Sequence, residues 1–206
     1  MSTRRSPLYC LRKYLRLAVK RNPTVMLPLY APSQSLVVVT PLGEELREMR
    51  SAFLSRLAVE RFLGYMHSQH ERMLGQSKRN VPNGPELIAR YGCDVRYGSH
   101  ALRLAYQGLE IDSTGSLSLP LPDHERERVL AVKRGEVRRA KVSAEISQVE
   151  AKVRALLDED RSPLPHVADL NAIDAWAVDT QRRHWDWAAC GLEDGCTKQR
   201  TPHSSL

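Results

Sequence analysis

The stretch EVRRAKVSAEISQVEAKVRALLD, residues 136–158, decides the fold class of this chain. Its apolar residues recur at alternating spacings of four and three, at Val142, Ile146, Val149, Val153 and Leu156. This spacing places them on one face of an α-helix that packs lengthwise against another helix. The stretch therefore predicts a long helix within a domain that is mainly helical.

Helical periodicity extends over most of the remaining sequence. Polar loops and Pro or Gly residues interrupt it, as expected at the ends of helices. The other predicted helices cover residues 8–21, 40–49, 55–74, 85–91, 93–111, 123–135 and 167–187.

One short run favours a strand instead. Residues 36–39, LVVV, are β-branched for the most part and lie between Pro32 and Pro41, so we predict one short buried strand there. Its backbone groups need a hydrogen-bonding partner, and residues 116–121 are the best candidate. The predicted fold class is mainly α, a helical domain with one or two short β-strands.

Length and composition indicate one folded domain. The 206 residues are 42% hydrophobic and 27% charged, and no apolar run reaches the roughly 18 residues of a membrane span. Four cysteines are too few for a secreted disulfide scaffold, which favours the cytoplasm, and the five-residue gap between Cys190 and Cys196 does not fit a zinc motif. The net charge of +7 favours an anionic partner such as a nucleotide or nucleic acid.

A polar ridge on the predicted helix 93–111 is the most informative feature for function. Arg96, His100, Arg103 and Gln107 follow one another at intervals of four, three and four residues, which aligns them along one side of a helix. Two guanidinium groups that flank an imidazole offer paired donors to phosphate oxygens. The same pattern is also typical of a solvated helix face, and this alternative stays open.

The first predicted helix carries a second group of cations. Arg12, Lys13, Arg16 and Lys20 occur there without an acidic residue. They fit a basic wall for a triphosphate or a nucleic acid, and they also fit the solvent-exposed face of an ordinary surface helix.

Several further motifs occur along the chain: LRKYLRLAVKRNPT at 11–24, FLSR at 53–56, RFLGY at 61–65, the ridge from Arg96 to Arg103, KRGE at 133–136, and SPLP at 162–165 with Asp169. In this order, over roughly residues 8–185, the set resembles the predicted nucleotidyltransferases of the DNA polymerase beta superfamily found in phages and bacteria. The resemblance implies transfer of a nucleotidyl group from a nucleoside triphosphate with two divalent metal ions, such as Mg²⁺.

The resemblance implies roles for seven residues. Those expected to contact phosphate or substrate are Lys13, Arg96, His100 and Arg103. Those expected to position the site or support the fold are Asn22, Glu136 and Asp169.

The carboxylates that hold the metal ions in the resembling enzymes have no counterpart here. Those enzymes carry a Gly-Ser pair followed by two aspartates two residues apart, but this sequence has no Asp before Asp94. Gly98-Ser99 is followed by Asp112, but Thr114 stands where the second carboxylate belongs. Asp158 and Asp160 have the right spacing, but they end a predicted helix. We predict that the chain holds no catalytic residues or metal ligands of its own.

We therefore expect the helical remnant of an α+β nucleotidyltransferase fold, a truncated or split protein that is inactive alone and has a separate N-terminal catalytic half as a candidate partner. The predicted regions are 1–49, a remnant of the core, 50–188, a helical domain, and 189–206, a mobile tail.

Two further interpretations stay open. The chain fits a non-enzymatic nucleic-acid or nucleotide-binding module that uses Arg96, Arg103 and the first helix. It also fits a helical interaction protein. Binding that weakens steeply with salt would favour general polyanion binding, whereas discrimination among nucleotides would favour a triphosphate site.

Overall fold

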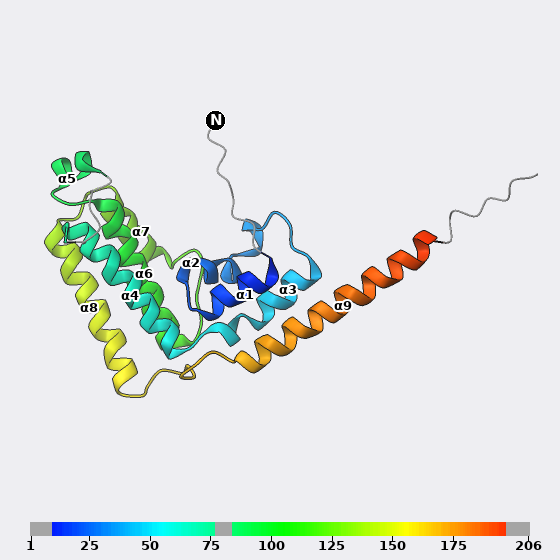
Figure 1. Cartoon of the computed structure of the whole chain (residues 1–206). Helices are drawn as coiled ribbons and strands as arrows, with labels where there is room; N and C mark the ends of the chain where they lie inside the picture. The colour runs from blue at the N-terminus through cyan, green and yellow to red at the C-terminus, as the bar shows by residue number, and fades with distance from the viewer. Residues whose placement is uncertain (1–9, 77–83, 197–206) are drawn as a thin grey trace, which may run out of the picture. The chain divides into compact units, whose positions relative to one another are not determined.

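The computed structural model describes residues 10–76 and 84–196, with residues 186–196 described by their backbone only, and it is built of helices (Figure 1). No strand occurs within these ranges, so the mainly helical class is confirmed. The α-helices are α1 (Leu11–Val19), α2 (Pro23–Met26), α3 (Pro41–Glu48), α4 (Arg56–Leu74), α5 (Pro85–Tyr91), α6 (Val95–Thr114), α7 (Asp123–Lys133), α8 (Arg139–Asp158) and α9 (Leu170–Cys196). The 3-10 helices are η1 (Leu27–Tyr30), η2 (Ser33–Ser35) and η3 (Met49–Phe53).

The chain divides into two compact units, Met1–Ala168 and Asp169–Leu206. Helices α1 to α8 belong to the first unit and α9 to the second. None of the helices described is both long and apolar enough to cross a membrane. The three regions expected from the sequence stay a prediction, and residues 197–206 of the expected tail lie outside the described residues.

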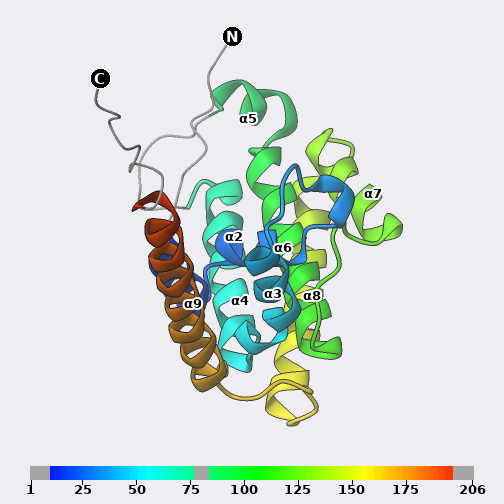
Figure 2. The same cartoon turned by 90° about the vertical axis from the view of Figure 1, so that its right-hand side faces the viewer.

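Helix α6 lies at the centre of the first unit, among α4, α7 and α8 (Figure 1, Figure 2). Leu102 and Ile111 on α6 are fully buried, as are Phe62 and Met66 on α4 and Ile146 on α8. Buried residues occur around most of the circumference of α6, which is typical of a helix enclosed by others.

Gly98 lets α4 approach α6 closely at one end of the pair. A Cβ atom at Gly98 would lie 2.6 Å from the sulfur of Met73, whereas one at Gly108 would lie 3.6 Å from the Cβ of Phe62, an ordinary van der Waals distance. The N-terminal part of α6 therefore lies against the C-terminal part of α4, and the C-terminal part of α6 lies against the N-terminal part of α4. The two helices are antiparallel.

The long helix expected at residues 136–158 is present as α8. It begins at Arg139 and ends at Asp158. Val142, Ile146, Val149 and Val153 are buried, as their spacing predicts, while Leu156 is only partly buried.

The turn between α7 and α8 explains part of the KRGE motif. Gly135 has a φ of 77°, a left-handed conformation that favours glycine. A Cβ atom there would also lie 2.2 Å from the ring of Tyr91, the last residue of α5. Gly135 therefore both ends α7 and lets α5 pack against this turn.

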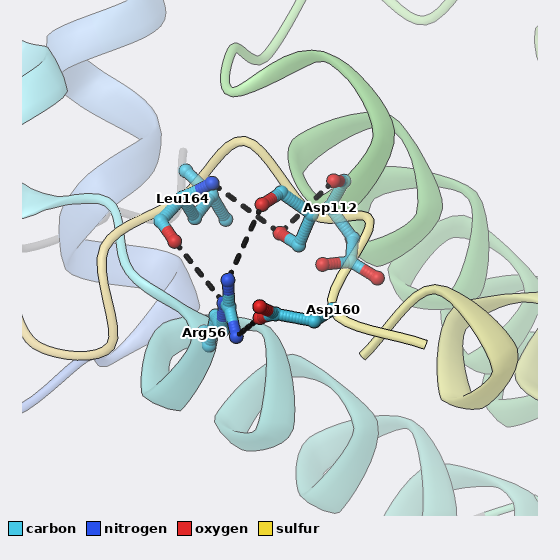
Figure 3. A network of polar contacts seen from close by, with 5 residues as sticks. Arg56, Asp112, Asp160 and Leu164 are labelled. Atoms are coloured by element: carbon cyan, nitrogen blue, oxygen red, sulfur yellow. Dashed lines mark hydrogen bonds and ion pairs between the residues drawn. The ribbon is translucent and has the colours of Figure 1, made fainter. Parts of the chain in front are cut away.

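The SPLP motif at residues 162–165 crosses one end of the first unit and binds Arg56 at the start of α4 (Figure 3). The Arg56 backbone N–H donates to the Pro165 carbonyl at 2.9 Å, and its Nε donates to the Leu164 carbonyl at 3.1 Å. Its guanidinium also forms an ion pair with Asp160. The Ser162 hydroxyl donates to the Asp112 carbonyl at 3.2 Å, which connects the same segment to the end of α6.

The prediction of short strands was wrong. Residues 36–39 run between η2 and α3, and the side chains of Val37 and Val38 are 98% and 80% exposed. Residues 116–121 also form no strand, although Leu117 and Leu121 are buried. A strand needs a second strand to satisfy its backbone, and no other described segment supplies one. The backbone N–H of Leu36 donates to the Ser33 carbonyl at 3.1 Å, as in a turn rather than a strand.

Candidate phosphate-binding site

The structure divides the predicted ridge on α6. Arg96 interacts with Asp94, the N-cap residue of this helix: its Nε donates to Oδ1 at 3.2 Å and its Nη2 to Oδ2 at 2.9 Å. The same Oδ1 accepts the backbone N–H of Arg96 at 3.0 Å, which caps the helix. The hydrogen bond to Asp94 raises the pKa of Arg96. Arg96 therefore supports the start of α6.

Gln107, at the other end of the ridge, lies in the core. Its side chain is buried, and its Oε1 has no hydrogen-bond partner. His100 and Arg103, between these two residues, are each partly buried. They are the part of the ridge that is placed to meet a ligand.

Arg72 joins His100 and Arg103 from the last turn of α4. Its guanidinium carbon lies 5.6 Å from the centre of the Tyr97 ring, a cation–π distance. Its charge also lowers the pKa of His100, so the two groups are close in space. Spacing along the chain does not reveal Arg72, because only the antiparallel packing of α4 on α6 brings it to the ridge.

The three basic groups form a positive, partly buried cluster, here called the Arg103 cluster (Arg72, His100 and Arg103). Burial lowers the pKa of His100, and the charges of Arg103 and Arg72 lower it further. Burial also lowers the pKa of Arg103. The Nε of Arg103 is buried and has no hydrogen-bond partner. Among the residues that the structure describes, neither arginine forms an ion pair with a carboxylate.

A cluster of this kind is complementary to an anion. A guanidinium that leaves water without a carboxylate partner costs free energy, and an external anion offsets that cost. Phosphate suits the cluster best, because arginine presents paired N–H donors that match phosphate oxygens.

Two other predicted residues lie near the start of the chain. Lys13 is exposed on α1. Asn22 caps α2, since its Oδ1 accepts the backbone N–H of Thr24 at 3.0 Å. Asn22 therefore ends the first predicted helix and begins the next one.

The remaining two predicted residues have local partners. Glu136 forms hydrogen bonds of 2.5 and 3.0 Å with the guanidinium of Arg134, and this contact lowers its pKa. Asp169, in the second unit, accepts the backbone N–H of Ala172 at 3.0 Å and so caps α9. Each stabilises a helix end or turn in its own unit.

The described residues do not fit a pair of divalent metal ions. Within the described ranges no group of three or more His, Cys, Asp and Glu side chains could hold a metal ion. Asp112 is fully buried on α6, and burial raises the pKa of its carboxyl group. The Thr114 hydroxyl donates to the carbonyl of Glu110 at 2.7 Å, and Asp160 pairs with Arg56. We therefore derive no chemical step through Mg²⁺.

Comparison with known proteins identifies one family. The model of the RlaP family, described as the RNA repair pathway DNA polymerase beta family, matches residues 7–179. No curated protein and no solved structure matches the chain.

An unpaired, partly buried cation should lower the stability of the folded protein. We expect Arg103→Met to raise the free energy of unfolding by about 0.5 to 2 kcal/mol, because it keeps the side-chain bulk and removes the charge. Urea denaturation with no added anion measures this difference.

Arg96→Met is the matched control, because it removes a guanidinium from the same helix but deprives the buried Asp94 of its ion-pair partner. We expect this variant to be less stable than the wild type. A loss of stability in Arg103→Met as large as that in Arg96→Met would contradict the unpaired state of Arg103.

Proposed function

The chain belongs to the RNA repair pathway DNA polymerase beta family, and on this premise we propose that its Arg103 cluster binds the phosphates of a nucleoside triphosphate. The observation that carries the proposal is the buried Nε of Arg103, which has no hydrogen-bond partner. The family membership supports a nucleotide as the source of the phosphate. The resemblance to nucleotidyltransferases favours the triphosphate.

The three groups of the cluster have different parts in this proposal. Arg103 supplies donors from within the helical bundle, where a hydrogen bond to an anion is stronger than in water. Arg72 supplies a second fork of donors, and its stacking on Tyr97 restricts the directions in which that fork points. His100 is neutral near pH 7, because its pKa is lowered, and it offers one N–H donor.

The proposal does not include catalysis by this chain alone. Nucleotidyl transfer with two metal ions needs carboxylates that hold them. We propose that a separate catalytic polypeptide supplies these carboxylates, and that the present chain contributes phosphate contacts. A cytoplasmic location is part of the same proposal.

A non-enzymatic nucleic-acid-binding module is the second candidate. The observation that favours it is the row of exposed cations formed by Arg12, Lys13 and Arg16 on α1 and by Lys20 at its C-cap. Such a row suits the regular charges of a phosphate backbone better than it suits one nucleotide.

Isothermal titration with ATP, CTP, GTP and UTP tests the triphosphate site. We expect Arg103→Gln to weaken binding roughly 10-fold to 100-fold, since it removes charge-assisted hydrogen bonds. Arg126→Gln is the matched control, because Arg126 is an exposed arginine of the same unit that pairs with Asp123 on α7. Equal affinities of wild type and Arg103→Gln would contradict the proposal.

The affinity for triphosphate should depend on pH through His100. The neutral imidazole gains a proton as the pH falls, and the added positive charge favours the anion. We expect the wild type to bind progressively more tightly than His100→Gln as the pH is lowered from about 7.5 to about 5.5. The ligand's own titration affects both proteins alike and cancels in the comparison. A constant ratio of affinities would exclude His100 from the site.

The isolated chain should not transfer a nucleotidyl group. Incubation with labelled nucleoside triphosphates, Mg²⁺ and an RNA or protein acceptor should leave the acceptor unlabelled, because the described residues provide no set of metal-binding carboxylates. A polymerase beta-like enzyme that is active under the same conditions serves as the positive control. Transfer that depends on this chain alone would refute the inactive assignment.

A further inference from the structure

We propose that one end of the helical bundle, here called the basic end, binds the phosphate backbone of a polynucleotide. This surface is distinct from the Arg103 cluster, and none of its residues has a part in the proposed triphosphate site. Its five exposed cations are Arg90, Lys133, Arg138, Arg139 and Lys141.

Side-chain contacts bring the segments of the basic end together. The Tyr91 ring lies against Gly135, which joins the end of α5 to the turn between α7 and α8. The charge of Arg139, the first residue of α8, acts on the thiol of Cys93 just before α6. Gly98, in the first turn of α6, lies near Val132 at the end of α7. Five segments therefore meet at this end of the first unit.

The cations of the basic end have no carboxylate partners in the part of the chain that the structure describes. Two nearby acids are already engaged: Asp94 is buried against Arg96, and Glu136 pairs with Arg134. The first turn of α8 contains no acidic residue. Glu86 is an exposed acid on α5, four residues before Arg90, so it offsets part of the charge of that arginine. The positive charge of the other four cations is not offset by an ion pair within the described residues.

Cations at the opposite end of the bundle have carboxylate partners: Arg56 pairs with Asp160, Arg126 with Asp123, and Arg161 with Glu159. Two arginines at the basic end are paired as well, Arg96 with Asp94 and Arg134 with Glu136, but within the described residues the five cations of the basic end have no such partner. An excess of unpaired positive charge at one end directs a polyanion to that face.

The chemistry of the surface favours a polynucleotide bound through its backbone. Arginine and lysine contact phosphates without reading the base, and several cations in succession suit a repeated charge. The aromatic ring of Tyr91 is engaged with Gly135 and with the guanidinium of Arg90, whose carbon lies 5.1 Å from the ring centre. Base stacking on this ring is thus restricted, and we infer binding with little sequence preference.

Fluorescence anisotropy with labelled oligouridylate of about 20 nucleotides, at several salt concentrations, tests this inference. The triple variant Arg138→Gln, Arg139→Gln and Lys141→Gln should lose three phosphate contacts. We expect its affinity at about 0.1 M salt to fall roughly 100-fold and the slope of log affinity against log salt to become shallower by about 2.

A second triple variant, Arg126→Gln, Lys152→Gln and Arg161→Gln, is the matched control, since it removes the same charge from exposed positions of the same unit that belong to none of the proposed binding surfaces. It should change the slope much less. Equal changes in both triple variants would overturn the inference, because they would show a response to net charge alone. Arg138→Lys with Arg139→Lys keeps the charge and should retain the slope, which separates loss of contacts from loss of folding.

Two further arms identify the ligand and the site. Oligodeoxythymidylate of equal length compares the two sources of a phosphate backbone, and a similar slope for both would support backbone recognition. Displacement of the RNA by polyglutamate at equal charge concentration would overturn the assignment to a polynucleotide.

Arg103→Gln separates this proposal from the triphosphate site. It should leave the slope of log affinity for RNA against log salt unchanged even where it weakens ATP binding, so failure of one proposal is distinguishable from failure of the other.

Discussion

Helix α6 is enclosed by α4, α7 and α8, and Gly98 lets α4 pack closely against its first turn. This close antiparallel contact fixes the level at which residues of the two helices meet. It sets Arg72 beside His100, and it places the first turn of α6 next to the last turns of α4 and α7. Both proposed anion-binding surfaces depend on this arrangement, since each takes its cations from helices that are separate in sequence.

The sequence predicted those features that local periodicity determines. The four-three spacing identified α8 and its buried valines, because each helical turn repeats the same environment. The strand at residues 36–39 was a wrong prediction, because β-propensity states a preference for packing in a sheet and the described chain forms no sheet. Arg72 could not be found, because its proximity to His100 depends on helix packing rather than on spacing. Arg96 was assigned to ligand binding, but a carboxylate two residues earlier engages it.

Two buried charged residues of α6 differ in how their charge can be neutralised. The Asp112 carboxyl group is fully buried without a hydrogen-bond partner for either oxygen, and its raised pKa shows that protonation relieves part of the cost. Arg103 cannot lose its charge in this way, because a guanidinium keeps its proton at physiological pH even when burial lowers its pKa. For a partly buried cation that keeps its charge and has no carboxylate partner, an anion from outside the chain would offset the cost of burial.

This difference connects stability with function. A cation retained in a partly buried position reduces the stability of the empty protein and is useful when an anion arrives, because the binding group is already held by the surrounding helices. The cations of the basic end are exposed to water, so they cost little in the empty protein. Their interaction with a polyanion is screened by salt, whereas the partly buried Arg103 is screened much less. The two proposed surfaces therefore differ in the ligand they would suit: the sheltered Arg103 cluster a single anion, and the open basic end a long and repetitive one.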